Sequence, residues 1–173
     1  MFQHFVTASS NLPSQLTERA RALVLAAPVM SADAIRIAPW EHLVLPADID
    51  GSHGDYRAPR RMCSLSANND YDAVNAWLAL HEAPATARAY RKEAERLLLW
   101  AILERGKPLS SLTSEDATAY RAFLLAPTSR WVGPARPRPS PEWRPFTGAL
   151  APRSIAYALG VISAMFRWLI AQC

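Results

Sequence analysis

Basic side chains recur at helical spacing between residues 83 and 105, and their chemistry is that of phosphate binding. At the period of an α-helix they gather on one side, opposite a row of apolar residues; they are Arg88, Arg91, Lys92 and Arg96. A single acid, Glu95, falls among them. Guanidinium and ammonium groups bind phosphates and release the counterions of a nucleic-acid backbone. The pattern favours an anion-binding helix face, and a merely solvated charged face is the alternative.

A second group of basic residues lies in segment 126–150, which also has six prolines, two tryptophans and one acid. Its four arginines are Arg130, Arg136, Arg138 and Arg144. The segment is longer than a simple connection between two helices needs to be. One interpretation is a surface loop that Trp131 and Trp143 pin to the core. The other is a semi-rigid basic arm, because proline stiffens a backbone and arginine pairs with phosphate in a planar fork.

The other reactive residue types show no pattern of a catalytic, metal or redox site. The two cysteines, Cys63 and Cys173, lie far apart in the sequence, so we expect neither a disulfide nor a cysteine-based metal site. The four histidines lack ligand spacing, and no paired carboxylates, nucleophile with base, or glycine-rich phosphate loop occurs. We therefore expect no enzyme activity, no cofactor, no metal ion and no small-molecule substrate.

Four segments carry helical periodicity together with signals for helix ends, and the first two adjoin each other. The first covers residues 70–82, with Asp70 as its predicted cap. The second covers residues 84–105, beginning with a proline at the first helical position and ending at Gly106. Tryptophans at apolar helical positions are predicted to lie in the core rather than to stack on a ligand; they are Trp77, Trp100 and Trp168.

The third and fourth helical segments complete the predicted domain. The third begins at Thr113, where Asp116 completes a capping box. The fourth begins at Pro152 and has a clean apolar seam, formed by Ile155, Leu159, Ile162, Phe166 and Leu169. No segment alternates with the period of a β-strand. The sequence therefore predicts an all-α domain of four helices over residues 70–173, with loop 126–150 between the third and fourth helices.

The composition fits one domain with an extension. The chain has 173 residues, half of them apolar, which is enough for one core of ordinary size. Residues 1–69 have weak patterning apart from an amphipathic helix near residues 14–27, and we interpret them as a partly ordered N-terminal extension. The formal net charge is +4, and the positive charge is concentrated after residue 82. A basic half is typical of proteins that bind nucleic acid or another anionic surface.

The sequence also bears on where the protein acts. No uninterrupted apolar run approaches the length that spans a membrane, and the N-terminus lacks the pattern of a secretory signal. Together with the expectation of unpaired cysteines, this predicts a cytoplasmic protein with no membrane partner.

The order of these segments is similar to that of a known protein family. WLALH ends the first helix, APATARAYRKEAERLLLWAILERGKPLSSLT covers the second and the turn after it, and EDATAYRAFL and LAPRSIAYALGVISAMFRWLIAQ follow. The spacing of Thr86, Tyr90 and Trp100, with the later P-R-S-I, resembles the N-terminal core-binding domain of tyrosine recombinases, the phage integrase family. That domain is also described as SAM-like. The Pro/Arg-rich insertion resembles one found in a bacterial branch of these integrases.

Two features depart from the family pattern. Family members often carry Ser before the proline that opens the second and fourth helices, where this chain has Ala83 and Ala151. Each helix would then lack a side-chain cap worth about 1 kcal/mol. The chain also stops at Cys173, where the catalytic domain of the family would follow. The resemblance therefore implies no catalytic arginine, histidine or nucleophilic tyrosine in this chain.

The resemblance further implies a DNA-binding module for DNA integration and recombination. In the family, this domain forms one half of a clamp on duplex DNA at a recombination half-site, its second and fourth helices face the DNA, and further protomers join in a synaptic tetramer. The residues predicted to bind DNA are Thr86, Arg88, Arg91, Lys92, Arg96, Arg130, Arg136, Arg138, Arg144, Arg153, Ser154, Tyr157 and Arg167.

Two other function classes stay open at the level of sequence. A helix-turn-helix DNA-binding regulator requires a short turn between two helices, and loop 126–150 argues against it. A helical protein-interaction domain would leave the basic face solvated and self-associate through an apolar face. The family resemblance separately implies that Trp77 or Leu80 could be exposed at a contact with a neighbouring protomer.

Overall fold

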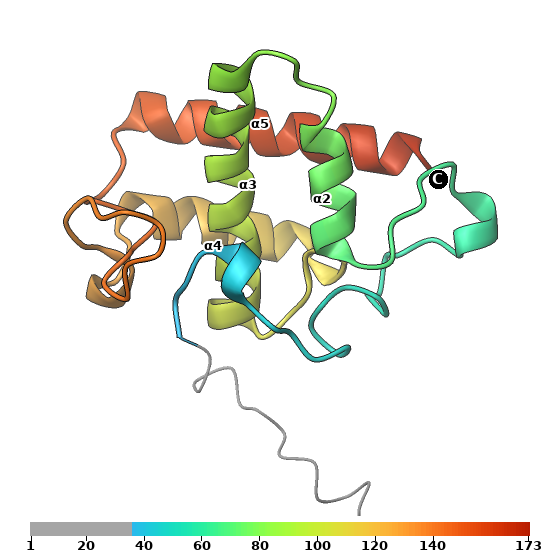
Figure 1. Ribbon diagram of the computed structural model, residues 1–173, viewed down its shortest axis with the longest axis horizontal. Coiled ribbons are helices and arrows are strands. Elements are labelled where there is room, and N and C mark those ends of the chain that lie inside the picture. Colours follow the sequence, from blue (N-terminus) through green and yellow to red (C-terminus); the bar gives the residue numbers. More distant parts are fainter. Residues whose placement is uncertain (1–35) are drawn as a thin grey trace, which may run out of the picture. The chain divides into compact units, whose positions relative to one another are not determined.

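A computed structural model describes residues 36–173, and within them the chain forms four α-helices (Figure 1). They are α2 (Asp70–Leu78), α3 (Pro84–Arg105), α4 (Ser114–Leu125) and α5 (Pro152–Ala171). The described part contains no β-strand and only an isolated bridge between Val132 and Phe146. The predicted all-α class is therefore confirmed for these residues. The helix expected near residues 14–27 lies outside them.

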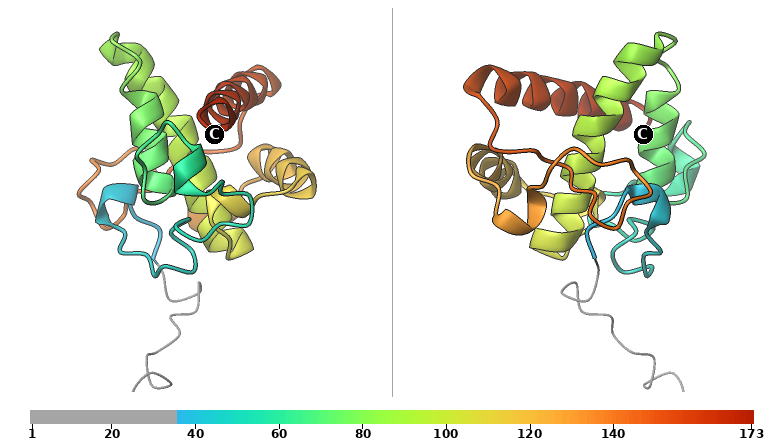
Figure 2. Two further views of the ribbon diagram at one scale, coloured as in Figure 1. Left: turned by 90° about the vertical axis from the view of Figure 1, so that its right-hand side faces the viewer. Right: turned by 60° about the vertical axis from the view of Figure 1, so that its left-hand side comes forward.

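Helix α3 occupies the centre of the described part. Helix α2 packs beside it, while α4 and α5 both cross it on another side, as the two views of Figure 2 show. Every residue from Glu93 to Leu103 is buried, so the C-terminal half of α3 is covered on all sides. A helix with one apolar and one basic face is thus the correct description only of the N-terminal half of α3.

The sequence signals at the helix ends act as expected, with two exceptions. One is the end of the first helix, which was predicted to reach residue 82, whereas α2 stops at Leu78 and residues 79–80 form a turn. Gly106 adopts the left-handed conformation after α3, with φ 59°, and Thr113 forms a capping box with Asp116 at the start of α4. The prediction that Asp70 caps α2 is wrong, because the side chain of Asn69 accepts the capping bond from Asp72 N instead. Asp70 is buried and accepts a 2.9 Å hydrogen bond from Ser110 N.

Residues 36–69 pack against the helices without forming a long helix of their own. Ile37 and Trp40 are buried in the core cluster. The carbonyl of Asp50 accepts from Asp70 N at 3.0 Å, and Tyr56 N donates to the carbonyl of Ser110 at 2.9 Å. Much of this segment contains turns and short 3₁₀ helices such as η2 (Trp40–His42) and η3 (Arg60–Met62).

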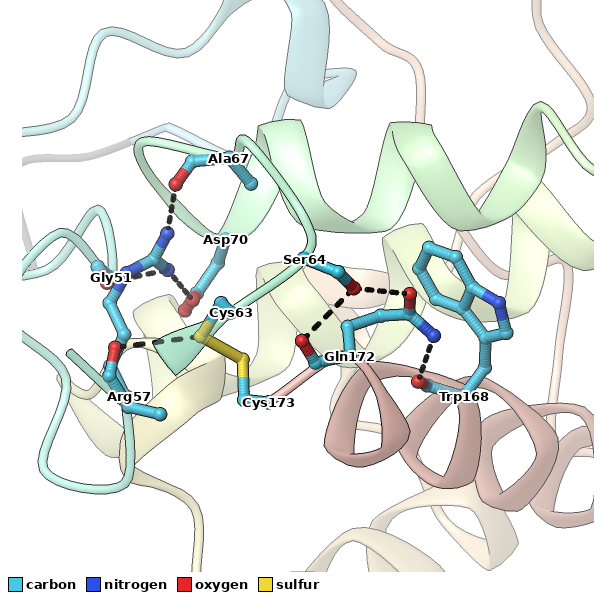
Figure 3. Close-up of a disulfide and its surroundings, with 10 residues drawn as sticks. Gly51, Arg57, Cys63, Ser64, Ala67, Asp70, Trp168, Gln172 and Cys173 are labelled. Atoms are coloured by element: carbon cyan, nitrogen blue, oxygen red, sulfur yellow. Dashed lines mark hydrogen bonds and ion pairs between the residues drawn. A yellow bond between two sulfur atoms is a disulfide. The ribbon is translucent and has the colours of Figure 1, made fainter. Parts of the chain in front are cut away.

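A disulfide joins Cys63 to Cys173, so the expectation that no disulfide forms is wrong (Figure 3). The two cysteines are 110 positions apart, and each stands alone in its stretch of sequence, which is why spacing did not reveal the pair. Beside the bond, Ser64 N donates to the carbonyl of Gln172 at 2.7 Å. The segment before α2 is thereby fixed to the C-terminal end of α5.

Loop 126–150 is folded back on the helices. Trp131, Trp143 and Phe146 are buried, and Trp131 Nε1 donates to Glu104 Oε1 on α3 at 2.5 Å. Gly133 N bonds the carbonyl of Phe146 at 2.9 Å, which closes the loop on itself. The interpretation as a loop pinned by its tryptophans is confirmed, and the phosphate binding expected of a semi-rigid basic arm stays a prediction.

Helix α5 supplies the predicted apolar seam. Ile155 and Ile162 are buried, and Leu159, Phe166 and Leu169 are partly buried against the core. Among the described residues this is the one helix that is long and apolar enough to cross a membrane, by length and composition alone. It packs against α2, α3 and α4, and 28% of its apolar window is buried.

We expect reduction of the Cys63–Cys173 bond to lower the free energy of unfolding by about 2–5 kcal/mol, because the bond closes a long loop in the unfolded chain. Urea unfolding of the full chain with and without dithiothreitol measures the change. The Cys63→Ser/Cys173→Ser variant is the control and should not respond to the reductant. Equal stability of oxidised and fully reduced wild type, with both thiols shown free by alkylation, would contradict the prediction.

Candidate nucleic-acid interface

A basic groove of about 430 Å³ lies between the N-terminal half of α3 and loop 126–150. Figure 2 shows the loop lying against α3 and beside η2. Six of the predicted DNA-binding residues line this groove, four from the helix and two from the loop: Arg88, Arg91, Lys92, Arg96, Arg138 and Arg144. The structure thus brings together two basic clusters that are separate in the sequence. We call this the α3–loop groove.

Arg96 forms part of the floor of the α3–loop groove. It is buried, and its guanidinium donates to the carbonyl of Pro145 at 3.0 and 2.9 Å and to Glu93 at 3.1 Å. The guanidinium carbon also lies 4.3 Å from the centroid of the Phe146 ring. Its predicted place on an open basic face is therefore wrong. Arg96 instead holds loop 126–150 against α3.

Arg138 fixes the middle of loop 126–150 through ion pairs with two carboxylates. Its guanidinium bonds both oxygens of Glu95 at 2.6 and 2.9 Å and both oxygens of Glu41 at 2.6 and 2.8 Å. Hydrogen bonds to Glu95 and then to Glu41 raise the pKa of Arg138 further above its ordinary range. Glu95 is buried and also accepts from Trp40 N at 3.0 Å, so one carboxylate organises the helix, the loop and η2.

Glu41 bridges Arg138 and Arg91 at the edge of the groove. Its Oε2 lies 2.9 Å from the Arg91 guanidinium, which in turn lies 5.4 Å from the centroid of the Trp40 ring. The hydrogen bond from Arg138 outweighs partial burial and lowers the pKa of Glu41 to about 2. Glu41 is therefore ionised throughout the physiological range.

Three cations of the α3–loop groove are not neutralised by close carboxylate bonds. Among the described residues Arg88 has no salt bridge within 4 Å, and Lys92 Nζ lies 3.5 Å from Glu93 with its side chain 58% exposed. Arg144 bonds only backbone carbonyls, the nearer being that of Trp143 at 2.7 Å. Six cations line the groove against three carboxylates, those of Glu41, Glu93 and Glu95, so the groove keeps a net positive charge.

The remaining predicted residues lie outside this groove. Arg130 is 3.7 Å from Glu104 near the end of α3, and Arg136 is 3.0 Å from Glu142 within the loop. Thr86 is partly exposed in the first turn of α3. The four predicted residues on α5 are all exposed, and they are Arg153, Ser154, Tyr157 and Arg167.

Tyr157 shows that α5 passes close to the N-terminal half of α3. Partial burial, with smaller effects of Tyr90 and Glu93 on α3, raises the pKa of the Tyr157 hydroxyl. Its side chain is nevertheless 49% exposed. The exposed face of α5, which also includes Ala156, Gly160 and Ile170, is therefore a neighbouring surface distinct from the α3–loop groove.

The acidic partners of this site were largely hidden in the sequence. Glu95 stood out as the single acid among the basic residues, but Glu41 lies in a proline-broken segment and Glu93 resembles an ordinary helix surface residue. The clustering of basic residues did indicate that acidic partners exist, because a cation that becomes buried needs a counter-charge. No local pattern identifies which acids supply them.

A larger hollow with a mainly apolar lining lies at the other end of the described part. Its volume is about 890 Å³, and its lining includes both cysteines, Leu112, Phe166 and Ile170. The described residues contain no group of three or more His, Cys, Asp or Glu side chains that could hold a metal ion. Leu80 is exposed. Trp77 and Trp100 are buried, as expected for core tryptophans, whereas Trp168 is only partly buried against the core.

Comparison with known proteins finds no matching family model, no matching curated protein and no matching solved structure.

Glu41→Gln should lower the free energy of unfolding by about 1–2 kcal/mol at neutral pH, because it removes a carboxylate held by two arginines. Because folding lowers the pKa of Glu41, its ionised carboxylate stabilises the fold fully at pH values above the unperturbed pKa of 4.5. This contribution is lost as the pH falls towards 2. The difference between wild type and variant should shrink over that interval. Urea unfolding at several pH values measures it, and a constant difference down to pH 2 would contradict the prediction.

Proposed function

We propose that the α3–loop groove binds the phosphate backbone of duplex DNA. The observation that carries this proposal is the arrangement of the cations in the groove. Arg96 and Arg138 are fixed by ion pairs with buried carboxylates. The positive charges of Arg88, Lys92 and Arg144 are not neutralised by a close carboxylate and are available to a ligand. Fixed cations in the floor shape the groove and add to its positive field. Exposed cations on the rim can neutralise phosphates and release counterions.

The class of protein that we propose is the core-binding domain of a site-specific tyrosine recombinase, with a SAM-like arrangement of its four helices. Supporting this are the order of the helices and the positions of Thr86, Tyr90, Trp100 and the P-R-S-I segment at the start of α5. In this proposal the chain is the non-catalytic half of a clamp on a recombination half-site. Other protomers of a synaptic tetramer are its further partners.

Helix α5 offers a second surface to the same duplex. Arg153, Tyr157 and Arg167 are exposed along it, and Ser154 lies in its first turn, where amide donors and the helix dipole favour an anion. Thr86 has the same position in α3. Because α5 crosses α3 (Figure 1), contacts from both helices can fall on one stretch of DNA.

A cytoplasmic location remains a prediction. Thiol–disulfide exchange keeps cysteines reduced in that compartment, so the Cys63–Cys173 bond would be open there and closed after exposure to oxidant. The basic groove does not contain either cysteine.

A protein-interaction domain is the second candidate function, favoured by one observation. An exposed apolar surface lies near the disulfide. It consists of the apolar hollow and the exposed side chains of Tyr56, Met62 and Ile170. In this alternative the basic groove is only solvated, and binding to DNA is absent or insensitive to its charges.

Charge reversal at the rim of the groove tests the proposed function. We expect Arg88→Glu/Lys92→Glu to weaken binding to a duplex by at least tenfold and to reduce the salt dependence by about two ions, because two phosphate contacts are lost. Fluorescence anisotropy with a labelled duplex over a salt series measures both quantities. Circular dichroism verifies that the helices are retained.

Arg60→Glu/Arg61→Glu is the matched control, since it changes the net charge equally. Both arginines are exposed on η3, at the opposite end of the described part from loop 126–150 (Figure 1). We expect a much smaller loss of affinity in this control. An equal loss in both variants would mean that only total charge matters, and no binding by wild type at low salt would favour the protein-interaction alternative.

A further inference from the structure

The carboxylate of Glu41 is held in a site built from two guanidinium groups. Arg138 grips it with two bonds, at 2.6 and 2.8 Å, and Arg91 adds a third at 2.9 Å. Both arginines line the α3–loop groove. The planar fork of arginine matches a carboxylate and a phosphate equally well. The position that Glu41 occupies therefore has the chemistry of a phosphate site.

We propose that Glu41 is an intramolecular competitor of DNA, which fills a phosphate position of the α3–loop groove and is displaced when the duplex binds. This inference rests on the proposed function and adds a regulation of that site. In the unbound chain Glu41 masks Arg91 and one side of Arg138. In the bound chain a backbone phosphate takes its place on both guanidinium groups.

The structure lets Glu41 leave without dismantling its surroundings. Trp40 is buried, and its backbone N–H bonds Glu95, so η2 stays anchored when the neighbouring side chain turns away. Arg138 keeps both bonds to Glu95, at 2.6 and 2.9 Å. Arg91 keeps its place beside the Trp40 ring. The cost of displacement is thus confined to the bonds of Glu41 itself.

Arg91 also has an unused donor. Its Nε is buried and has no hydrogen-bond partner among the described residues. A carboxylate offers two oxygens, and both oxygens of Glu41 are already engaged by Arg138. A phosphate brings further acceptor oxygens, so a small turn of the Arg91 guanidinium can satisfy this donor when phosphate replaces the carboxylate.

Competition by Glu41 favours polymeric phosphate over single ions. A free phosphate ion must displace Glu41 from its hydrogen bonds and gains interactions only with Arg91 and Arg138. A DNA backbone offers additional phosphates to Arg88, Lys92 and Arg144 in the same binding event, so the cost of displacement is shared. The groove should therefore respond to duplex DNA and ignore millimolar inorganic phosphate.

The test compares Glu41→Gln with Glu142→Gln. Both changes remove one negative charge from a carboxylate that pairs with an arginine of loop 126–150, Arg138 in the first case and Arg136 in the second. We expect Glu41→Gln to bind a labelled duplex at least fivefold more tightly than Glu142→Gln at the same salt concentration. Inorganic phosphate should compete with the duplex in Glu41→Gln at lower concentration than in wild type.

Arg91→Gln supplies an independent measurement. If Glu41 masks Arg91, this substitution changes the affinity of the wild-type chain less than twofold and that of the Glu41→Gln chain at least fivefold. Should Glu41→Gln fail to fold, Arg91→Gln is compared with Arg88→Gln in the otherwise wild-type chain. Equal losses of affinity would mean that Glu41 does not mask Arg91 in the unbound chain, which would overturn the inference.

The outcomes separate this inference from the proposed function. Binding by wild type, with Glu41→Gln no tighter than Glu142→Gln, overturns the competition and leaves the DNA-binding groove in place. Binding by Glu41→Gln alone supports both. No binding by any of these folded variants, at any salt concentration, overturns the proposed function and the competition together.

Discussion

The buried charges of α3 are the constraint on which the rest of this structure depends. Glu93, Glu95 and Arg96 lie in the half of the helix that is covered on all sides, and a buried charge without a partner is costly. Glu93 and Arg96 pair with each other, and the remaining hydrogen-bond partners of Glu95 and Arg96 come from outside the helix. Arg138 and the carbonyl of Pro145 come from loop 126–150, and Trp40 N comes from η2. The satisfaction of charge in α3 thus determines where two irregular segments lie.

The groove follows from that arrangement. Since Arg138 and Pro145 must reach α3, the loop lies along the helix and its own arginines come to face Arg88 and Lys92. Two buried aromatic side chains of the loop also hold it against the helices, because Trp131 and Phe146 are buried between α3 and α4. A loop with so many prolines loses less conformational entropy on being fixed than a flexible one. The basic groove is therefore built on rigid supports, although most of its walls are not helical.

The helices could be predicted from local signals, and the contacts between distant segments could not. Pro84, Gly106 and the Thr113–Asp116 pair act within one turn of the chain, so their consequences are legible in sequence. The basic residues of the groove were also identifiable one by one. Their partners were not, because Glu41 and Arg138 are 97 positions apart and the two cysteines 110. Pairings of that kind depend on the whole fold, and a single sequence contains no local record of them.

The covalent and the ionic links of residues 36–69 act at different places. The disulfide and the bonds of Ser64 fix this segment to the C-terminal end of α5 (Figure 3), whereas Trp40 and Glu41 fix it to α3 and loop 126–150. Opening the disulfide removes a restraint from the unfolded chain and leaves every ion pair of the groove intact. Removing Glu41 changes the charge of the groove and leaves the covalent link intact. The covalent link and the charge of the groove can thus be changed independently of each other, because they lie at opposite ends of the same segment.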